Sequence, residues 1–127
     1  MKKEEIASLL YSAAANLPER LSGNTQIEIL AERIADVVQA HRDVLIDLLR
    51  TWLSLRIPQS KRTSEDGERE FWMWLALRVA EKYHLHELRP DIEALVADVR
   101  AGRTFLPYYA EMIEKYLAHL MRNPNDK

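Results

Sequence analysis

The segment from residue 25 to residue 56 carries the longest unbroken hydrophobic periodicity in the chain. Neither Gly nor Pro interrupts it, and its apolar side chains recur three or four residues apart, as on one stripe of an α-helix. Thr25, followed three residues later by Glu28, has the pattern of a capping box, which marks a helix start. The stripe consists of Ile27, Leu30, Ile34, Val37, His41, Val44, Leu48, Trp52 and Leu55. We therefore predict one long helix over residues 25–56.

The length of this helix raises a geometric problem. At 1.5 Å per residue it would be about 48 Å long, whereas a compact chain of this size has a diameter of roughly 36 Å. The helix must therefore overhang the domain or break. The polar cluster around His41 is the favoured place for a break, but the stripe keeps its phase across His41. The sequence leaves both possibilities open, and the continuous helix is the prediction.

Two regions have more apolar surface than a helix with one wet face can carry. Residues 44–57 are apolar on nearly every side, and residues 71–77 form an unbroken apolar run. Such helices are buried in a core or in a subunit interface, and the sequence does not decide which. The candidate interface residues are His41, Leu45, Leu49, Trp52, Leu53, Trp72 and Trp74. His41 is among them because one polar side chain in an apolar seam commonly fixes register or oligomeric state.

The rest of the chain also has helical periodicity. We expect helices over residues 3–16 and 65–83, and two more that begin at Pro90 and near Pro107. No segment alternates as a strand would. The predicted fold is all-α, a single compact bundle of five or six helices in one domain of residues 1–127. A polar loop at about 58–66 and a frayed tail at 123–127 complete the prediction.

The composition excludes several kinds of chemistry. The chain has no Cys, which removes disulfides, thiol nucleophiles and Cys-containing zinc sites. Eighteen basic and twenty acidic side chains are mixed along it, so no polybasic tract marks nucleic acid or anionic lipid as a partner. No stretch approaches the roughly 20 apolar residues of a membrane span. Glu4 and Glu5 stand where a signal peptide would stay positive. We expect a cytoplasmic protein without a cofactor.

Histidine spacing gives only incomplete metal motifs. His84 and His86, with Glu87, could converge in an extended turn. Glu81 and His84 form one Glu-x-x-His unit, which helical di-iron proteins contain twice together with two further Glu. Only one copy is present. We therefore predict no metal site.

The segment Arg78-Val-Ala-Glu-Lys-Tyr-His84 resembles the Arg-x(4–6)-His signature of the HEPN ribonucleases, which are small all-helical proteins that often work as dimers. The resemblance covers these seven residues. It implies that Arg78 and His84 of two subunits converge on the scissile phosphate, where Arg78 holds charge and His84 moves a proton. The other interpretation is structural: Arg78 pairs with a nearby acid such as Glu81 or Glu70, and His84 ends the helix.

The expected function is that of a non-enzymatic module for protein–protein interaction, assembly or regulation, whose partner is a protein and which self-associates as a homodimer. Two alternatives remain open. One is the HEPN-like dimeric ribonuclease that uses Arg78 and His84. The other is a small helical subunit of a nucleic-acid-bearing assembly, with phosphate contacts from dispersed cations. The candidate cations are Lys61, Arg62, Arg100 and Arg103.

Overall fold

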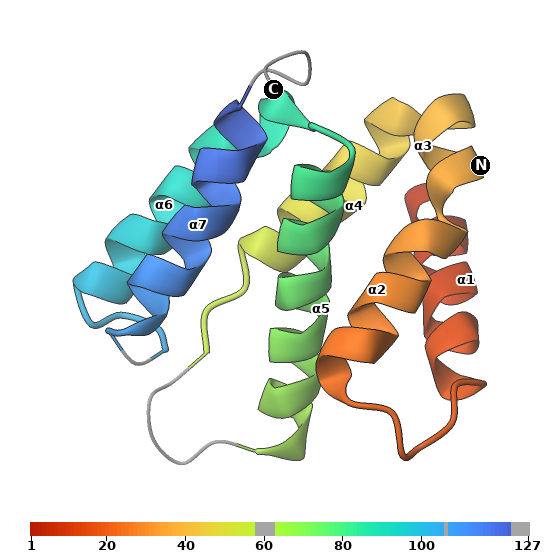
Figure 1. The fold of residues 1–127 in the computed structure, drawn as a ribbon, viewed down its shortest axis with the longest axis horizontal. Coiled ribbons are helices and arrows are strands. Elements are labelled where there is room, and N and C mark those ends of the chain that lie inside the picture. The colour runs from red at the N-terminus through yellow and green to blue at the C-terminus, as the bar shows by residue number, and fades with distance from the viewer. Residues whose placement is uncertain (58–62, 106, 123–127) are drawn as a thin grey trace.

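Every regular element of the described chain is helical. The computed structural model describes residues 1–57, 63–105 and 107–122, and in them it has seven α-helices, one 3₁₀ turn and no strand (Figure 1). The elements are α1 (Lys3–Ala15), α2 (Gly23–Arg33), α3 (Ala35–Ala40), α4 (Arg42–Leu53), α5 (Ser64–Lys82), η1 (His86–Leu88), α6 (Arg89–Arg100) and α7 (Tyr109–Met121). The predicted all-α fold is confirmed. Residues 58–62 of the predicted loop and the predicted frayed tail lie outside the described residues.

Short polar side chains decide where α2 and α5 begin. The Thr63 hydroxyl accepts a hydrogen bond from the Asp66 N–H at 3.2 Å, and the Asp66 carboxylate accepts one from the Thr63 N–H at 3.0 Å. This is a capping box. The capping box predicted at Thr25 is wrong, because the Ser22 hydroxyl accepts the Thr25 N–H at 3.2 Å. Ser22 is therefore the N-cap of α2, and the helix begins at Gly23.

The predicted continuous helix over residues 25–56 is also wrong, since it is divided into α2, α3 and α4. Ile34 (φ −94°, ψ 10°) separates α2 from α3, and His41 (φ −139°, ψ 43°) separates α3 from α4. After His41 the chain turns back, so that α4 runs behind α5 and packs against α1 and α5 (Figure 1). Val37 before the turn and Leu48 after it are both buried. Turning back buries most of the stripe inside one bundle, which a straight helix longer than the domain could not do.

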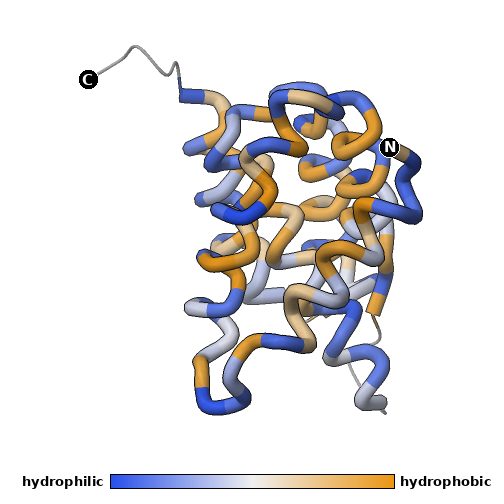
Figure 2. Tube along the Cα trace, turned by 90° about the vertical axis from the view of Figure 1, so that its right-hand side faces the viewer, coloured by the Kyte–Doolittle hydropathy of each residue, from blue (hydrophilic) through white to orange (hydrophobic). Residues whose placement is uncertain are grey.

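Helix α5 lies at the centre of the bundle. It packs against α4 behind it and against α2 and α7 at its sides (Figure 1). Met73, Leu75 and Leu77 from its apolar run are fully buried. Apolar and polar stretches alternate along the helices (Figure 2), as expected where each helix buries one side. The remaining face of α5 lies between α2 and α7.

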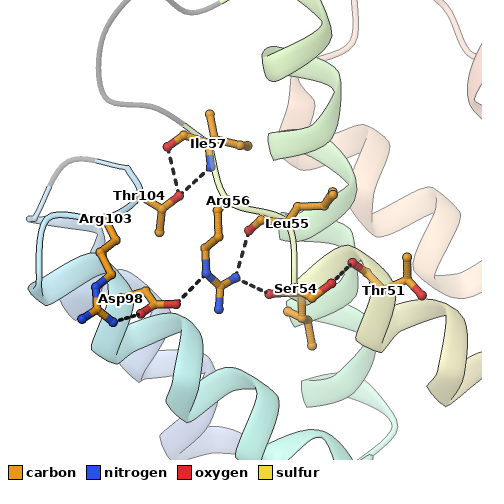
Figure 3. A network of polar contacts seen from close by, with 9 residues as sticks. Thr51, Ser54, Leu55, Arg56, Ile57, Asp98, Arg103 and Thr104 are labelled. Atoms are coloured by element: carbon orange, nitrogen blue, oxygen red, sulfur yellow. Dashed lines mark hydrogen bonds and ion pairs between the residues drawn. The ribbon is translucent and has the colours of Figure 1, made fainter.

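A polar network ties the segment after α4 to the connection between α6 and α7 (Figure 3). The Ile57 N–H donates to the Thr104 hydroxyl at 2.7 Å, and that hydroxyl donates to the Ile57 carbonyl at 3.0 Å. Beside them the Arg56 guanidinium binds Asp98 at 2.7 Å, and Arg103 binds the same carboxylate at 3.0 Å. These two ion pairs lower the pKa of Asp98. The network joins two loops that are distant in sequence.

Candidate interaction groove

Four of the predicted interface residues belong to the core of the chain itself. Leu45, Leu49 and Leu53 are fully buried, and Trp52 is almost so. Helix α4 that carries them packs against α1, α5 and α6. These side chains are thus covered within one chain, and the apolar region 44–57 is core rather than exposed surface.

The other three predicted residues lie nearer to solvent. His41 is half-buried at the turn between α3 and α4. Trp72 lies in an aromatic cluster, where its ring contacts Tyr11 edge-on at 4.8 Å and lies 5.1 Å from Trp52. Trp74, two residues later on α5, points toward α7 and is only partly covered. The apolar run 71–77 is therefore core on one side and accessible at Trp72 and Trp74.

A groove runs along α5 between α2 and α7, and we call it the α5 groove. It consists of two adjoining hollows of about 400 and 490 Å³, which share Met112 and Tyr116. Its floor is formed by residues of α5 at helical spacing, namely Gly67, Glu70, Phe71, Trp74, Arg78 and Glu81. Residues of α2 form one wall and residues of α7 form the other. The floor changes from aromatic to charged between Trp74 and Arg78.

The aromatic half of the groove has an apolar surface with fixed geometry. The Trp74 ring lies 5.8 Å from Tyr109 and 6.1 Å from Tyr116, measured between ring centroids. Tyr108 packs edge-on against Tyr109 at 4.7 Å and is 60% exposed, and Met112 is 44% exposed. Large aromatic side chains and Met with accessible surface are the residues that interface cores contain most often.

Burial raises the pKa of two tyrosine hydroxyls in this half. It raises the pKa of Tyr109 to about 12, and hydrogen bonds with Tyr108 and Glu70 also contribute to this rise. Burial likewise raises the pKa of Tyr116. Aromatic rings with partly buried hydroxyls suit contact with an apolar surface.

A chain of charged side chains crosses the other half of the groove. Arg78 donates two hydrogen bonds to the Glu28 carboxylate, at 2.6 and 3.1 Å, and a third to Glu81 at 2.7 Å. The other oxygen of Glu81 lies 2.5 Å from Nδ1 of His119. The bonds from Arg78 lower the pKa of Glu28, and Glu28 in turn raises the pKa of Arg78. These contacts link α2, α5 and α7 across the groove.

The structure brings Arg78 and His84 to one hollow, but Arg78 already has two carboxylate partners. Together with Glu81, Lys82, His119 and Arg122, they line a hollow of about 420 Å³ at the end of the groove. The pairing of Arg78 with Glu81, expected under the structural interpretation, is confirmed. His84 follows the end of α5 with φ 52°, and its buried Nδ1 has no hydrogen-bond partner in the described chain.

His119 is the residue of this site that the sequence analysis missed. It lies on α7 and its partner Glu81 lies on α5, so no local motif joins them. The only signal in the sequence is that Met112, Tyr116 and His119 recur at three and four residues on one helix. That spacing predicts a shared face, but it does not predict what the face meets.

The other candidate residues are held in separate ion pairs. Glu87, considered as a metal ligand with His84 and His86, binds Arg42 at 2.7 Å instead. Among residues 1–57, 63–105 and 107–122, no three His, Asp or Glu side chains are grouped closely enough to hold a metal ion.

The cations of the nucleic-acid alternative are distributed rather than gathered. Arg100 pairs with Glu114, and Arg103 pairs with Asp98 at 3.0 Å. Lys61 and Arg62 lie outside the described residues. In the described part of the chain, no helix is long and apolar enough to cross a lipid bilayer.

The fold and the groove thus define a small helical bundle whose central helix is accessible along one face. Comparison with known protein families, with curated proteins and with solved structures finds no match. The function is therefore argued from the groove and its side chains.

Proposed function

We propose that this chain is a protein-interaction module that forms a homodimer through the aromatic half of the α5 groove. The observation that carries the proposal is the apolar surface of this half. Tyr108 and Met112 are 60% and 44% exposed, and they lie beside the partly covered rings of Trp74 and Tyr116. Covering such side chains contributes about 25 cal/mol for each Å² of apolar surface removed from water.

The charges on α7 favour a second copy of the chain as the occupant. Glu111 and Lys115 are both exposed on α7, and Lys115 also lines the groove beside Met112. The ion pairs of α7 with other described residues involve Glu114 and His119 instead. If two α7 helices pack antiparallel about a two-fold axis near Ile113, each Glu111 meets the Lys115 of the partner. A two-fold interface uses the same patch twice, so the patch must be complementary to itself in this way.

The size of the contact sets what a stable dimer requires. Specific interfaces bury about 800 Å² per partner, which is roughly a tenth of the 7577 Å² surface of the described structure. The exposed side of α7 and the aromatic floor of the groove must therefore both take part. Dimer formation should be lost when a charge is placed at the centre of this surface.

The test is absolute mass by light scattering after gel filtration, over a concentration series. Met112→Glu should shift the chain to monomer, because it buries an unpaired carboxylate in the contact. Leu9→Glu is the matched control, since Leu9 is 42% exposed on α1, outside the groove. A wild-type chain that is monomeric at every concentration, or a dimer that both variants weaken equally, would refute the proposal.

Charge reversal tests the antiparallel arrangement itself. Lys115→Glu places it opposite Glu111 of the partner and should weaken the dimer. The double variant Glu111→Lys with Lys115→Glu restores opposite charges across the two-fold axis and should recover it. If the double variant dimerises no better than Lys115→Glu alone, the arrangement is wrong.

The HEPN-like ribonuclease alternative rests on the hollow that Arg78 and His84 share. It requires Arg78 to bind a phosphate, whereas its guanidinium donates three hydrogen bonds to Glu28 and Glu81. This engagement places the alternative second. RNA cleavage that disappears in both Arg78→Ala and His84→Ala would support it. Cleavage that survives both changes would reject it.

A further inference from the structure

The charged end of the α5 groove has the features of a ligand site, and this inference does not depend on dimer formation. His119 is the clearest of them. Its Nδ1 lies 2.5 Å from the Glu81 carboxylate, while its side chain is 52% exposed. A carboxylate on one ring nitrogen fixes the orientation of the imidazole. The other nitrogen, Nε2, is then left directed toward a ligand.

The carboxylate that orients His119 is itself held rigidly. The Glu81 side chain is only 16% exposed and accepts a hydrogen bond from Arg78 at 2.7 Å. Arg78 is fixed in turn by its two bonds to Glu28 on α2. Three helices therefore set the position of one exposed imidazole. Such support is typical of residues that must present a donor at a defined point.

His84 adds strain at the same hollow. Its φ of 52° lies in the left-handed region, which is unfavourable for a non-glycine residue. Its Nδ1 is buried without a hydrogen-bond partner in the described chain, which is also unfavourable. Unfavourable features of both kinds concentrate where a protein binds ligands.

Two unpaired cations favour an anion in this hollow. Arg78, Lys82 and Arg122 line it together with Glu81, but Arg78 is already paired with Glu28 and Glu81. The cationic groups left for an anion are therefore those of Lys82 and Arg122. Neither Lys82 nor Arg122 forms an ion pair with another described residue, so both are able to bind a ligand.

We propose that this end of the groove binds a phosphate group, which Lys82, Arg122 and Nε2 of His119 contact. Phosphate fits because it accepts several charge-assisted hydrogen bonds at once from ammonium and guanidinium groups. Arg78 and Glu81 act as positioning residues, since they orient His119. The phosphate could be free or part of single-stranded RNA, and the two sources are separated by experiment.

The test follows the histidine ring protons of the full chain by NMR during titration with inorganic phosphate at constant ionic strength. We expect the signals of His119 and His84 to shift and saturate, while that of His41 stays unchanged. Lys82→Ala with Arg122→Ala should weaken binding roughly tenfold or more, because two charge-assisted hydrogen bonds are lost. Lys2→Ala with Arg20→Ala removes the same charge from exposed positions outside the hollow, and should leave binding within about twofold.

A short RNA oligonucleotide added in the same assay identifies the source of the phosphate. Affinity at least tenfold above that of inorganic phosphate indicates a nucleic-acid phosphate, and similar affinities indicate the free ion. The proposal is overturned if 20 mM phosphate moves neither His119 nor His84. It is also overturned if the Lys82 and Arg122 changes weaken binding no more than the control changes do. The dimer proposal is unaffected by either result, because light scattering tests it separately.

Discussion

Replacing Thr104 by Val should destabilise the fold through one unsatisfied backbone group. Thr104 is fully buried, and its hydroxyl accepts the Ile57 N–H at 2.7 Å and donates to the Ile57 carbonyl at 3.0 Å. Val has nearly the same shape but cannot form either bond. The Ile57 carbonyl keeps its bond from the Phe105 N–H at 3.1 Å. The Ile57 N–H is therefore the group that loses its partner.

The expected loss in the free energy of unfolding is about 2 kcal/mol, since an unsatisfied buried donor costs roughly 1–3 kcal/mol. A chain of this length has a total stability of only about 6–19 kcal/mol. Urea unfolding followed by circular dichroism at 222 nm measures the change. With a urea dependence of about 2 kcal/mol per M, the midpoint should fall by about 1 M.

Two control variants separate the hydrogen bonds from other effects. Thr104→Ser keeps the hydroxyl and removes one methyl group, which should cost about 1 kcal/mol. Arg103→Ala removes an ion-pair partner of Asp98 whose side chain is 74% exposed, and it should lower the stability much less than Thr104→Val does. The reasoning is refuted if Thr104→Val unfolds within about 0.5 kcal/mol of the wild type, or if it is more stable than Thr104→Ser.

Three further measurements test single features of the structure. Gly102 has φ 76°, so Gly102→Ala should lower the free energy of unfolding by about 1 kcal/mol in urea, and an unchanged midpoint would contradict this. The pKa of Tyr109 is raised to about 12, so its ionisation should appear near that pH at 295 nm and vanish in Tyr109→Phe. The folded chain keeps this proton while the unfolded chain loses it near pH 10, so stability should fall between pH 10 and 12. Arg78 lowers the pKa of Glu28, so the stability from this pair is present above pH 4.5 and lost as the pH falls through the folded value. Glu28→Gln should therefore reduce the difference in the free energy of unfolding between pH 7 and pH 3, by an amount within the roughly 0.2–1 kcal/mol of an exposed pair.

Local patterns determined which parts of the chain are helical. The three-and-four spacing of the stripe from Ile27 to Leu55, the apolar run 71–77 and Pro90 at the start of α6 all act within a few residues of one another. These signals depend on backbone hydrogen bonds and side-chain spacing inside one element. They are therefore readable without knowledge of the fold. The predicted N-cap of α2 was Thr25 instead of Ser22. Both residues have a hydroxyl that can accept a hydrogen bond from a backbone N–H, and the sequence does not show at which of them the helix begins.

The break at His41 was decided by packing instead. Its stripe keeps a helical phase, and a straight helix satisfies every local rule. The straight helix is less stable than the broken one because it would extend beyond the bundle. Turning back covers Leu45, Leu49 and Trp52 with other helices. Because of the same packing, these residues lie in the core, although the sequence analysis predicted them at an interface. Burial is a property of the whole chain, so no window of sequence contains it.

The sequence by itself determined that this protein is an all-α bundle with no thiol chemistry, because composition and periodicity are local properties. The tertiary structure alone decided that Glu28, Arg78, Glu81 and His119 form one chain of contacts across three helices. It also decided that one face of α5 stays open between α2 and α7. Side chains separated by 38 to 50 positions meet only when helices pack, and the energy of packing depends on all of them together.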